Sequence, residues 1–419
     1  MATDIKDITH AVEACAVMDL LPGRPRLLAL GEPTHGAGTV LDTRNELFRQ
    51  LVEQEGYRTI SIESDCLMGL LVDDYVTSGA GTLDEVMERG FSHAWGAFAG
   101  NRELVRWMRE HNESRPASEQ VRFAGFDGPL EITGAASPRQ ALTALHGHLS
   151  SHVEAELLPC TAQTLDRLLG PDDRWTDPAA MTDPARSFGQ SAEAARLRLL
   201  TDDLVALLDA RTPQLIASDS REGWHRARLY GRTAVGLLRY HFWMADASPS
   251  RFSWLMGLRD SMMAANLLAL AERGPVLVNA HNGHLQRDRS TTRMAGRPLE
   301  WWSAGALVSA RLGEGYAFLA TALGTIRHQG VDAPPPASVE GLLYALREDR
   351  CLVDAAGLAA RLGDRRPAPR VSPYYGYSPL DPAHLERIDG ILFVKDVPRS
   401  RGPSTGRPAP AYGGPASRG

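Results

Sequence analysis

The chain has little of what marks several common protein classes. Only two of its 45 basic residues are lysines, Lys6 and Lys395, so a catalytic lysine of the Schiff-base type is not expected. The four cysteines lie far apart and include no C-x-x-C pair, which signals neither a zinc ribbon nor a disulfide framework. We therefore expect a reduced, cytoplasmic protein.

Charge and hydropathy argue against two further classes. The net charge of -6 provides no general attraction to nucleic acid or to anionic lipid. No stretch approaches the roughly 18 apolar residues of a membrane helix, and the acidic N-terminal segment lacks the pattern of a secretory signal. We expect a globular enzyme whose partner is a small molecule, with no nucleic acid and no membrane involved. The sequence does not indicate its oligomeric state.

Known catalytic signatures are missing as well. The sequence contains no G-x-S-x-G nucleophile elbow, which argues against a serine hydrolase of that type. It also lacks the G-x-x-x-x-G-K-[ST] phosphate loop, the H-E-x-x-H zinc helix and the glycine pattern of a dinucleotide-binding fold. Nucleotide hydrolysis and nicotinamide chemistry are therefore not expected.

What the sequence does contain is a series of short apolar runs that predict buried strands. They cover residues 26–30, 59–62, 121–126, 275–280, 316–323 and 390–394. Between the first two runs, residues 40–54 carry leucines at helical spacing, and Gly56 follows as a helix end. This order predicts an α/β fold with a mixed, largely parallel sheet flanked by helices.

A long region without strand signals divides this predicted core. We expect residues 138–250 to form a helical insertion, a lid over the active-site cleft, between core segments 1–137 and 251–330. Residues 331–398 are expected to complete the core as a C-terminal subdomain. Residues 399–419 are mostly Pro, Gly, Ser, Arg and Ala, which predicts a disordered tail.

Titratable side chains stand at the ends of four predicted strands. In chain order they are Glu32 with His35, then Glu63, then Asp127, and finally His281 with His284. Because parallel strands present their carboxyl ends at one edge of a sheet, we expect these side chains to line one crevice. Arg44, on the helix after the first strand, adds a permanent positive charge. Asp127 and Arg44 also fit structural roles, as a helix cap and a solvated charge.

Several motifs together resemble the erythromycin esterase family. They are Gly-Glu-Pro-Thr-His-Gly at 31–36, Arg44, Ile-Glu-Ser at 62–64, Leu-Arg-Asp-Ser-Met at 258–262 and Ala-His-Asn-Gly-His-Leu at 280–285. Their order and spacing match the family from about Leu27 to Leu323. The resemblance is looser at 124–127 and near Gly390. At 37–40, Ala-Gly-Thr-Val replaces an acidic-aromatic pair common in relatives, which bears on the substrate pocket.

The resemblance implies an α/β core with a helical lid and hydrolysis of a macrolactone ester. It also implies a reaction without a covalent enzyme intermediate, an essential metal or a cofactor. His35 would be the general base that activates water. The other members of the catalytic set would be Glu32, Glu63, Arg44, His281 and His284. We assign Arg259 and Asp127 to substrate binding.

Three other functions fit the same residues. A biosynthetic cyclase, dehydratase or lyase would use the His/Glu/Arg site to move a proton without adding water, and the mass of the product distinguishes it from a hydrolase. A divalent-metal hydrolase would use the carboxylates and histidines as ligands. A sequestering protein would bind a macrolide-like ligand without turnover. The sequence leaves open both the substrate and whether the role is in antibiotic resistance or in biosynthesis.

Overall fold

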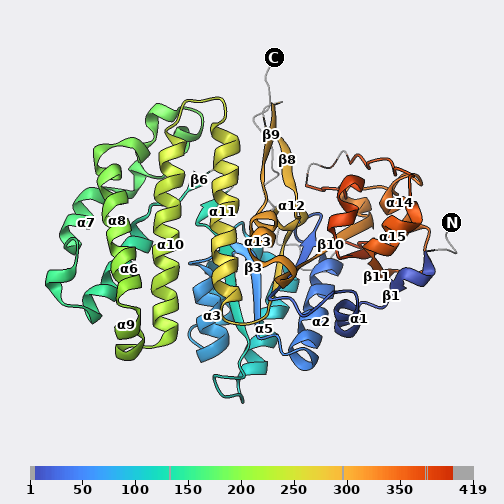
Figure 1. Cartoon of the computed structure of the whole chain (residues 1–419), viewed down its shortest axis with the longest axis horizontal. Coiled ribbons are helices and arrows are strands. Elements are labelled where there is room, and N and C mark those ends of the chain that lie inside the picture. The colour runs from blue at the N-terminus through green and yellow to red at the C-terminus, as the bar shows by residue number, and fades with distance from the viewer. Residues whose placement is uncertain (1–4, 132–133, 295–296, 373, 375, 400–419) are drawn as a thin grey trace. The chain divides into compact units, whose positions relative to one another are not determined.

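The contacts of the chain divide it into two compact units. The computed structural model describes residues 5–131, 134–294, 297–372, 374 and 376–399 (Figure 1). The first unit comprises residues 1–63, 68–125 and 267–419, and the second comprises 64–67 and 126–266. The helical segment predicted at 138–250 lies within the second unit, and its role as a lid stays a prediction. The tail predicted at 399–419 lies, except for its first residue, outside the described residues.

An eight-stranded sheet organises the first unit, with strand order β1-β11-β12-β10-β2-β7-β3-β4. The strands are β1 (Thr9–His10), β2 (Leu27–Glu32), β3 (Thr59–Asp65), β4 (Arg122–Asp127), β7 (Val276–His281), β10 (Tyr316–Thr325), β11 (Arg350–Asp354) and β12 (Gly390–Asp396). The pairs from β12 through β10, β2 and β7 to β3 are parallel, whereas β1 and β11 pair antiparallel at the opposite edge. The predicted α/β class with a mixed, largely parallel sheet is confirmed.

The apolar runs of the sequence became strands because burial on both faces of a parallel sheet requires continuous hydrophobicity. Every residue of β2 and of β10 is buried. Each of the six predicted strands is present. Each extends one to three residues beyond its predicted carboxyl end. The extensions of β2, β3 and β7 contain Glu32, Glu63 and His281, polar residues that a hydrophobic pattern does not include.

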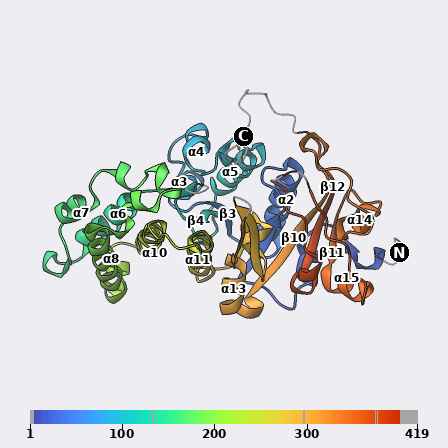
Figure 2. The ribbon, with the colours of Figure 1, turned by 90° about the horizontal axis from the view of Figure 1, so that it is seen from above.

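Helices of the first unit pack on this sheet. They are α1 (Ala14–Asp19), α2 (Gly38–Gln54), α3 (Gly69–Ser78), α4 (Leu83–Arg89), α5 (Ala99–Asn112), α12 (Asn282–Leu285), α13 (Ala304–Leu312), α14 (Val339–Tyr344) and α15 (Ala355–Leu362). Leucines of β2 and β7 share one hydrophobic cluster with Phe48 of α2 and Met108 of α5. Figure 2 shows α2 and α5 on one side of the central strands and α13 on the other.

The second unit is mainly helical. Its helices are α6 (Arg139–His152), α7 (Ala162–Leu169), α8 (Ala192–Ala210), α9 (Thr212–Ser218) and α10 (Arg221–Met244). α10 packs along both α6 and α8, and α7 contacts α6 and α8. A single cluster of leucines and alanines fills the space between them. A further helix, α11 (Arg251–Ala271), continues from this unit into the first.

The structure also contains strands that the hydrophobic pattern did not predict. β1 is a short edge strand and β11 is a short strand between β1 and β12, and β8 (Arg289–Met294) pairs with β9 (Arg297–Trp302) in a separate two-stranded sheet. A second small sheet joins β5 (Leu130–Glu131) to β6 (Gly134–Ala135). These segments carry too many polar residues to stand out as apolar runs.

Across the described part of the chain, helices that combine membrane-spanning length with membrane-like hydropathy are not found.

Two glycines in helices provide a test of the packing. A Cβ at Gly69, the first residue of α3, would lie 2.6 Å from the backbone nitrogen of Gly125, whereas a Cβ at Gly147 of α6 would meet nothing within 4 Å. We expect Gly69→Ala to lower the free energy of unfolding by about 1–3 kcal/mol through overpacking. Gly147→Ala should raise it by about 0.5–1 kcal/mol, because alanine restricts the unfolded chain and favours helix.

Urea denaturation of the two variants beside the parent chain measures both effects. Equal stability changes of the same sign in the two variants would contradict the close approach of α3 to β4.

Candidate active site

The candidate active site begins where β2 ends. Its last residue, Glu32, is followed by the turn that carries His35 into α2. Gly36 in this turn has φ +74°, a conformation that favours glycine, and a Cβ there would lie 2.6 Å from the ring of Phe98. Backbone conformation and close packing therefore both require a glycine directly after His35.

His35 and Glu32 form a hydrogen-bonded pair. Nδ1 of His35 lies 2.7 Å from Oε1 of Glu32, and the two side chains are 25% and 4% exposed. A carboxylate accepts a hydrogen bond, so Nδ1 carries the proton and Nε2 is the nitrogen that can accept one. The ring of Trp95 stands 4.7 Å from the imidazole, centroid to centroid, and packs against it. The pair has the geometry of a base held in one tautomer by an acid.

The second carboxylate oxygen of Glu32 lacks a hydrogen-bond donor among the described residues. Oε2 is buried and has no hydrogen-bond partner among them. A buried acceptor without a donor is costly, so such atoms mark places where a donor arrives with a ligand or with water.

Glu63, at the end of β3, holds the end of β7 and the helix that follows. Its Oε2 accepts the backbone N–H of His281 at 2.9 Å, and its Oε1 lies 3.4 Å from Nε2 of His284. Glu63 is 2% exposed and the side chain of His284 is 13% exposed. One buried carboxylate thus fixes both histidines of the Ala-His-Asn-Gly-His-Leu motif.

His281 faces His35 but is a different kind of histidine. The ring centroids are 5.4 Å apart, and Nδ1 of His281 accepts the N–H of Gly283 at 3.1 Å. Burial first, and then the neighbouring His35, lower the pKa of His281 to about 3, against a smaller opposing effect of Glu63. A hydrogen bond to the backbone of Pro33 engages the ring further. His281 is therefore neutral at pH 7.

Arg44 is the buried cation of the site. The residue, on α2, is 1% exposed. Its guanidinium donates to the side-chain oxygens of Asn45, Asn101 and Asn279 at 2.8–3.1 Å. Burial lowers the pKa of Arg44 to about 10, and the charge of Glu32 opposes that shift, so the group stays charged at pH 7. Four of its hydrogen bonds go to amides, and the charge of Glu32 is close enough to act on the guanidinium.

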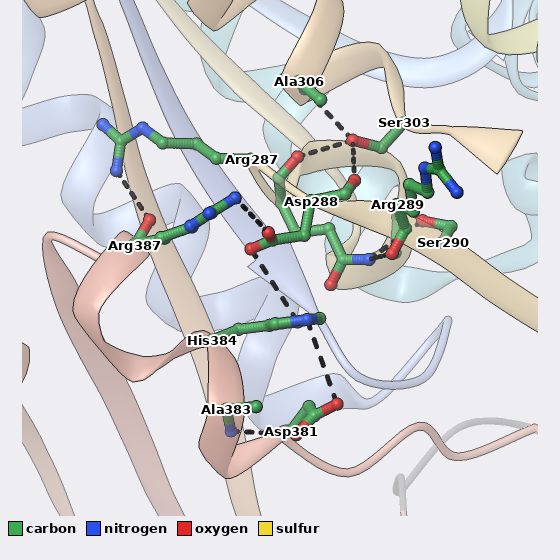
Figure 3. Close-up of polar contacts among 12 residues, drawn as sticks. Arg287, Asp288, Arg289, Ser290, Ser303, Ala306, Asp381, Ala383, His384 and Arg387 are labelled. Carbon is green, nitrogen blue, oxygen red and sulfur yellow. Dashed lines mark hydrogen bonds and ion pairs between the residues drawn. The ribbon is translucent and has the colours of Figure 1, made fainter.

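The short helix α12, which carries His284, is held from its far end as well. Directly after it, the carbonyls of Gln286 and Asp288 accept hydrogen bonds from the hydroxyl of Ser303 at 2.6 and 2.9 Å, and Ser303 also caps α13 (Figure 3). Asp288 in turn lies beside His384 and Arg387 of the C-terminal segment (Figure 3). The histidine position is therefore fixed by residues distant in sequence.

The structure thus brings six of the eight predicted site residues together. We call them the His35 cluster: Glu32, His35, Arg44, Glu63, His281 and His284. All six belong to the first unit.

The other two predicted residues, Asp127 and Arg259, pair with each other in the second unit. Arg259 donates from Nε and Nη2 to the carboxylate of Asp127 at 2.6–3.1 Å, and Asp127 is fully buried. Their part in substrate binding stays a prediction. Asp127 Oδ1 also accepts the N–H of Gly128, but a strand, β5, follows rather than a helix, so Asp127 is not the helix cap considered for it.

Sequence reasoning missed the residues that surround the cluster. Asn45, Asn101 and Trp95 carried no recognisable signal, because each lies on a helical segment outside the motifs. Asn279 was visible as the polar residue before Ala280 in an otherwise apolar strand. An asparagine inside a buried strand is a signal that could have identified it as a partner for a buried charge.

The fold and the cluster together define an α/β protein with a histidine–carboxylate site at the carboxyl edge of parallel strands. The family model "Erythromycin esterase" matches residues 52–397. The chain belongs to the erythromycin esterase family, as the motifs suggested. Glu32, His35 and Arg44 precede the matched segment.

Individual relatives are distant. Erythromycin esterase type II of Escherichia coli is 32% identical over 110 residues, which are 26% of this chain and 24% of that protein. The match therefore spans about a quarter of the curated relative.

Three solved structures share the fold. A Bacillus cereus protein has a TM-score of 0.67 at 17% identity, covering 94% of this chain and 97% of its own. A succinoglycan biosynthesis protein has a TM-score of 0.68 at 15% identity, covering 94% and 96%. The erythromycin esterase EreC, as a His-to-Asn mutant in its open conformation, has a TM-score of 0.60 at 18% identity, covering 88% and 90%. Likeness at these identities shows the fold.

The burial of Arg44 predicts a large effect of a conservative substitution. Arg44→Lys keeps the charge but removes the planar fork, so the asparagine oxygens lose donors in a buried place. We expect the free energy of unfolding to fall by about 2–3 kcal/mol. Urea denaturation measures it. The matched control is Arg106→Lys on the exposed side of α5, which should change stability by less than about 0.5 kcal/mol.

The lowered pKa of His281 predicts how this ring titrates. In NMR spectra of histidine-labelled protein, the His281 ring signals should not shift between pH 8 and about pH 5, and His281→Asn assigns them. The unfolded chain takes up this proton near the usual pKa of about 6.5. This group therefore makes the folded state lose stability as the pH falls from about 6.5 toward 3, since the unfolded state binds more protons there. A titration midpoint above pH 6 would contradict the assignment.

Proposed function

We propose that the chain is an esterase that hydrolyses an ester or macrolactone by direct attack of water, with His35 as the general base. The observation that carries this proposal is the 2.7 Å contact between Nδ1 of His35 and Glu32, because it leaves Nε2 to accept a proton. Membership of the erythromycin esterase family supports an esterase or hydrolase function in general. The E. coli relative is named an erythromycin esterase, which makes a macrolactone the first substrate class to try.

The first step is attack of water on the ester carbonyl. Nε2 of His35 takes the proton as the water oxygen bonds to the carbonyl carbon, and a tetrahedral oxyanion forms. Glu32 holds the imidazole in the reactive tautomer and stabilises the imidazolium that results. General-base help of this type contributes roughly 10² to 10⁴ in rate.

The second step is loss of the alcohol. The tetrahedral intermediate collapses, the carbon–oxygen bond to the alcohol breaks, and the leaving alkoxide receives a proton. We assign this proton to the His35 imidazolium, which thereby returns to its neutral form, with His284, whose Nε2 lies beside the carboxylate of Glu63, as a polar neighbour. His281 is neutral, so it contributes a hydrogen bond or shape rather than positive charge. Products are a carboxylic acid and an alcohol, with one water consumed.

Arg44 is a positioning residue in this scheme. Its hydrogen bonds to three asparagines and its burial favour an electrostatic role over direct donation to the oxyanion. The charges of Arg44 and Glu32 attract each other, so Arg44 would help to hold the Glu32 carboxylate in place beside His35.

The decisive experiment replaces the base. We expect His35→Ala to lower kcat on the true substrate by at least about a hundredfold while the protein stays folded by circular dichroism. The substrate is found by a mass-spectrometric screen of macrolactones and acyl esters, in which hydrolysis adds one water to the product. The matched control is His328→Ala, an exposed histidine on a turn after β10, which should leave kcat unchanged.

Two results would overturn the proposal. One is unchanged turnover in His35→Ala, which would remove this residue as the base. The other is a product of unchanged mass or one that has lost water, which would indicate a cyclase or a dehydratase instead.

A further inference from the structure

Two histidines outside the His35 cluster share one face of α6. His148 and His152 are four residues apart near the end of this helix, so both side chains project from the same side. Their ring centroids are 4.9 Å apart and the planes are tilted by 48°. Leu145 and Leu149, next to the histidines on the same half of the helix, belong to the hydrophobic cluster of the second unit and anchor this end of α6.

A carboxylate from another element completes the group. Asp219 follows the last residue of α9, and α9 is tied to the end of α6 by a hydrogen bond of 2.9 Å from Gln214 to the carbonyl of His152. A Cβ at Gly223 would lie 1.7 Å from Oδ2 of Asp219, so the missing side chain of this glycine makes room for the carboxylate.

The three side chains converge. One potential ligand atom from each of His148, His152 and Asp219 lies within 4.8 Å of the other two. Ligands bound to one zinc ion at 2.0–2.1 Å in tetrahedral geometry stand about 3.4 Å apart, so small side-chain rotations close the site. Among the residues the structure describes, this is the group of three His, Cys, Asp or Glu side chains whose potential ligand atoms lie within 4.8 Å of one another.

Two details show that these nitrogens suit a ligand. Nε2 of His148 is buried and has no hydrogen-bond partner among the described residues. The hydroxyl of Ser218 lies 3.3 Å from Nδ1 of His152. When Nδ1 donates to this hydroxyl, Nε2 of His152 presents a lone pair, which is the usual support of a metal-bound histidine.

The donor set selects a class of ion. Two imidazole nitrogens and one carboxylate oxygen suit zinc and the neighbouring divalent transition metals, whereas calcium and magnesium prefer oxygen donors. The end of a helix adds a favourable field for a cation, because its free carbonyls carry partial negative charge.

We propose that His148, His152 and Asp219 bind a divalent ion of the zinc type that joins the end of α6 to the turn between α9 and α10. The ion would be structural: it links residues of one unit that lie about 70 positions apart in the chain, and it binds the folded state only. Its remaining coordination positions would be filled by water. The proposal is independent of the esterase mechanism, which uses other residues.

The test is a calorimetric titration of the full-length chain, freed of metal with a chelator, with zinc chloride. We expect binding of one zinc ion per chain and a Tm that rises with zinc concentration. His148→Ala and Asp219→Asn should each weaken binding by at least about tenfold. His328→Ala, an exposed histidine elsewhere, and His284→Ala, in the His35 cluster, should bind zinc as the parent does.

One variant also distinguishes a loss of zinc binding from misfolding. Asp219 is exposed, so Asp219→Asn should keep the Tm of the metal-free parent, and a loss of zinc binding in it then reports on coordination. Absence of zinc binding by the parent chain would overturn the proposal. So would binding that survives the double substitution His148→Ala with His152→Ala, or binding that His284→Ala alone abolishes.

Discussion

β7 pairs in parallel with β2 on one side and with β3 on the other, and the arrangement of the site depends on this pairing. The strand arrives from a point in the chain more than 200 residues after β3 begins, yet its register sets His281 opposite Glu32 and Asn279 opposite Ile62. A shift of one residue would turn each of these side chains to the other face of the sheet. The buried apolar residues of β2 and β7 make such a shift unfavourable, so hydrophobic packing holds polar groups in place.

The polar groups in turn hold one another. A charge inside a protein requires partners, because removal from water is expensive. Arg44 meets this requirement with amide oxygens, which neutralise none of its charge, and Glu63 meets it with a backbone N–H and an imidazole. The charges of Arg44 and Glu32 therefore still interact with each other. Paired directly with a carboxylate, the same arginine would exert a much weaker field there.

The sequence predicted the strands and the polar residues at their ends well, for a physical reason. Buried parallel strands must be continuously apolar, so β2, β7 and β10 stand out, and the turn after β2 carries its own glycine and proline. The structure brings six of the eight residues named from the sequence together in the His35 cluster, and places Asp127 and Arg259 elsewhere. The assignment of their individual roles stays a prediction, because the chemical step is not visible in a structure.

What the sequence could not provide are contacts between segments with no pattern of their own. Asn101 and Trp95 come close to Arg44 and His35 only because α5 packs on α2, and nothing in their spacing announces this. The short strands β1 and β11 owe their conformation to their neighbours, β1 to β11 and β11 to β12, rather than to a strong preference of their own. The pairing of Asp127 with Arg259 likewise joins positions 132 residues apart.

The hydrogen bonds described for the His35 cluster all join residues of one unit, which carries an evolutionary consequence. Substitutions within residues 126–266 leave the pairs between Glu32 and His35 and between Glu63 and His284 untouched. The His35 cluster and residues 126–266 are thus free to change at different rates. A lineage built on this plan is able to vary residues 126–266 while the contacts of the His35 cluster are inherited intact.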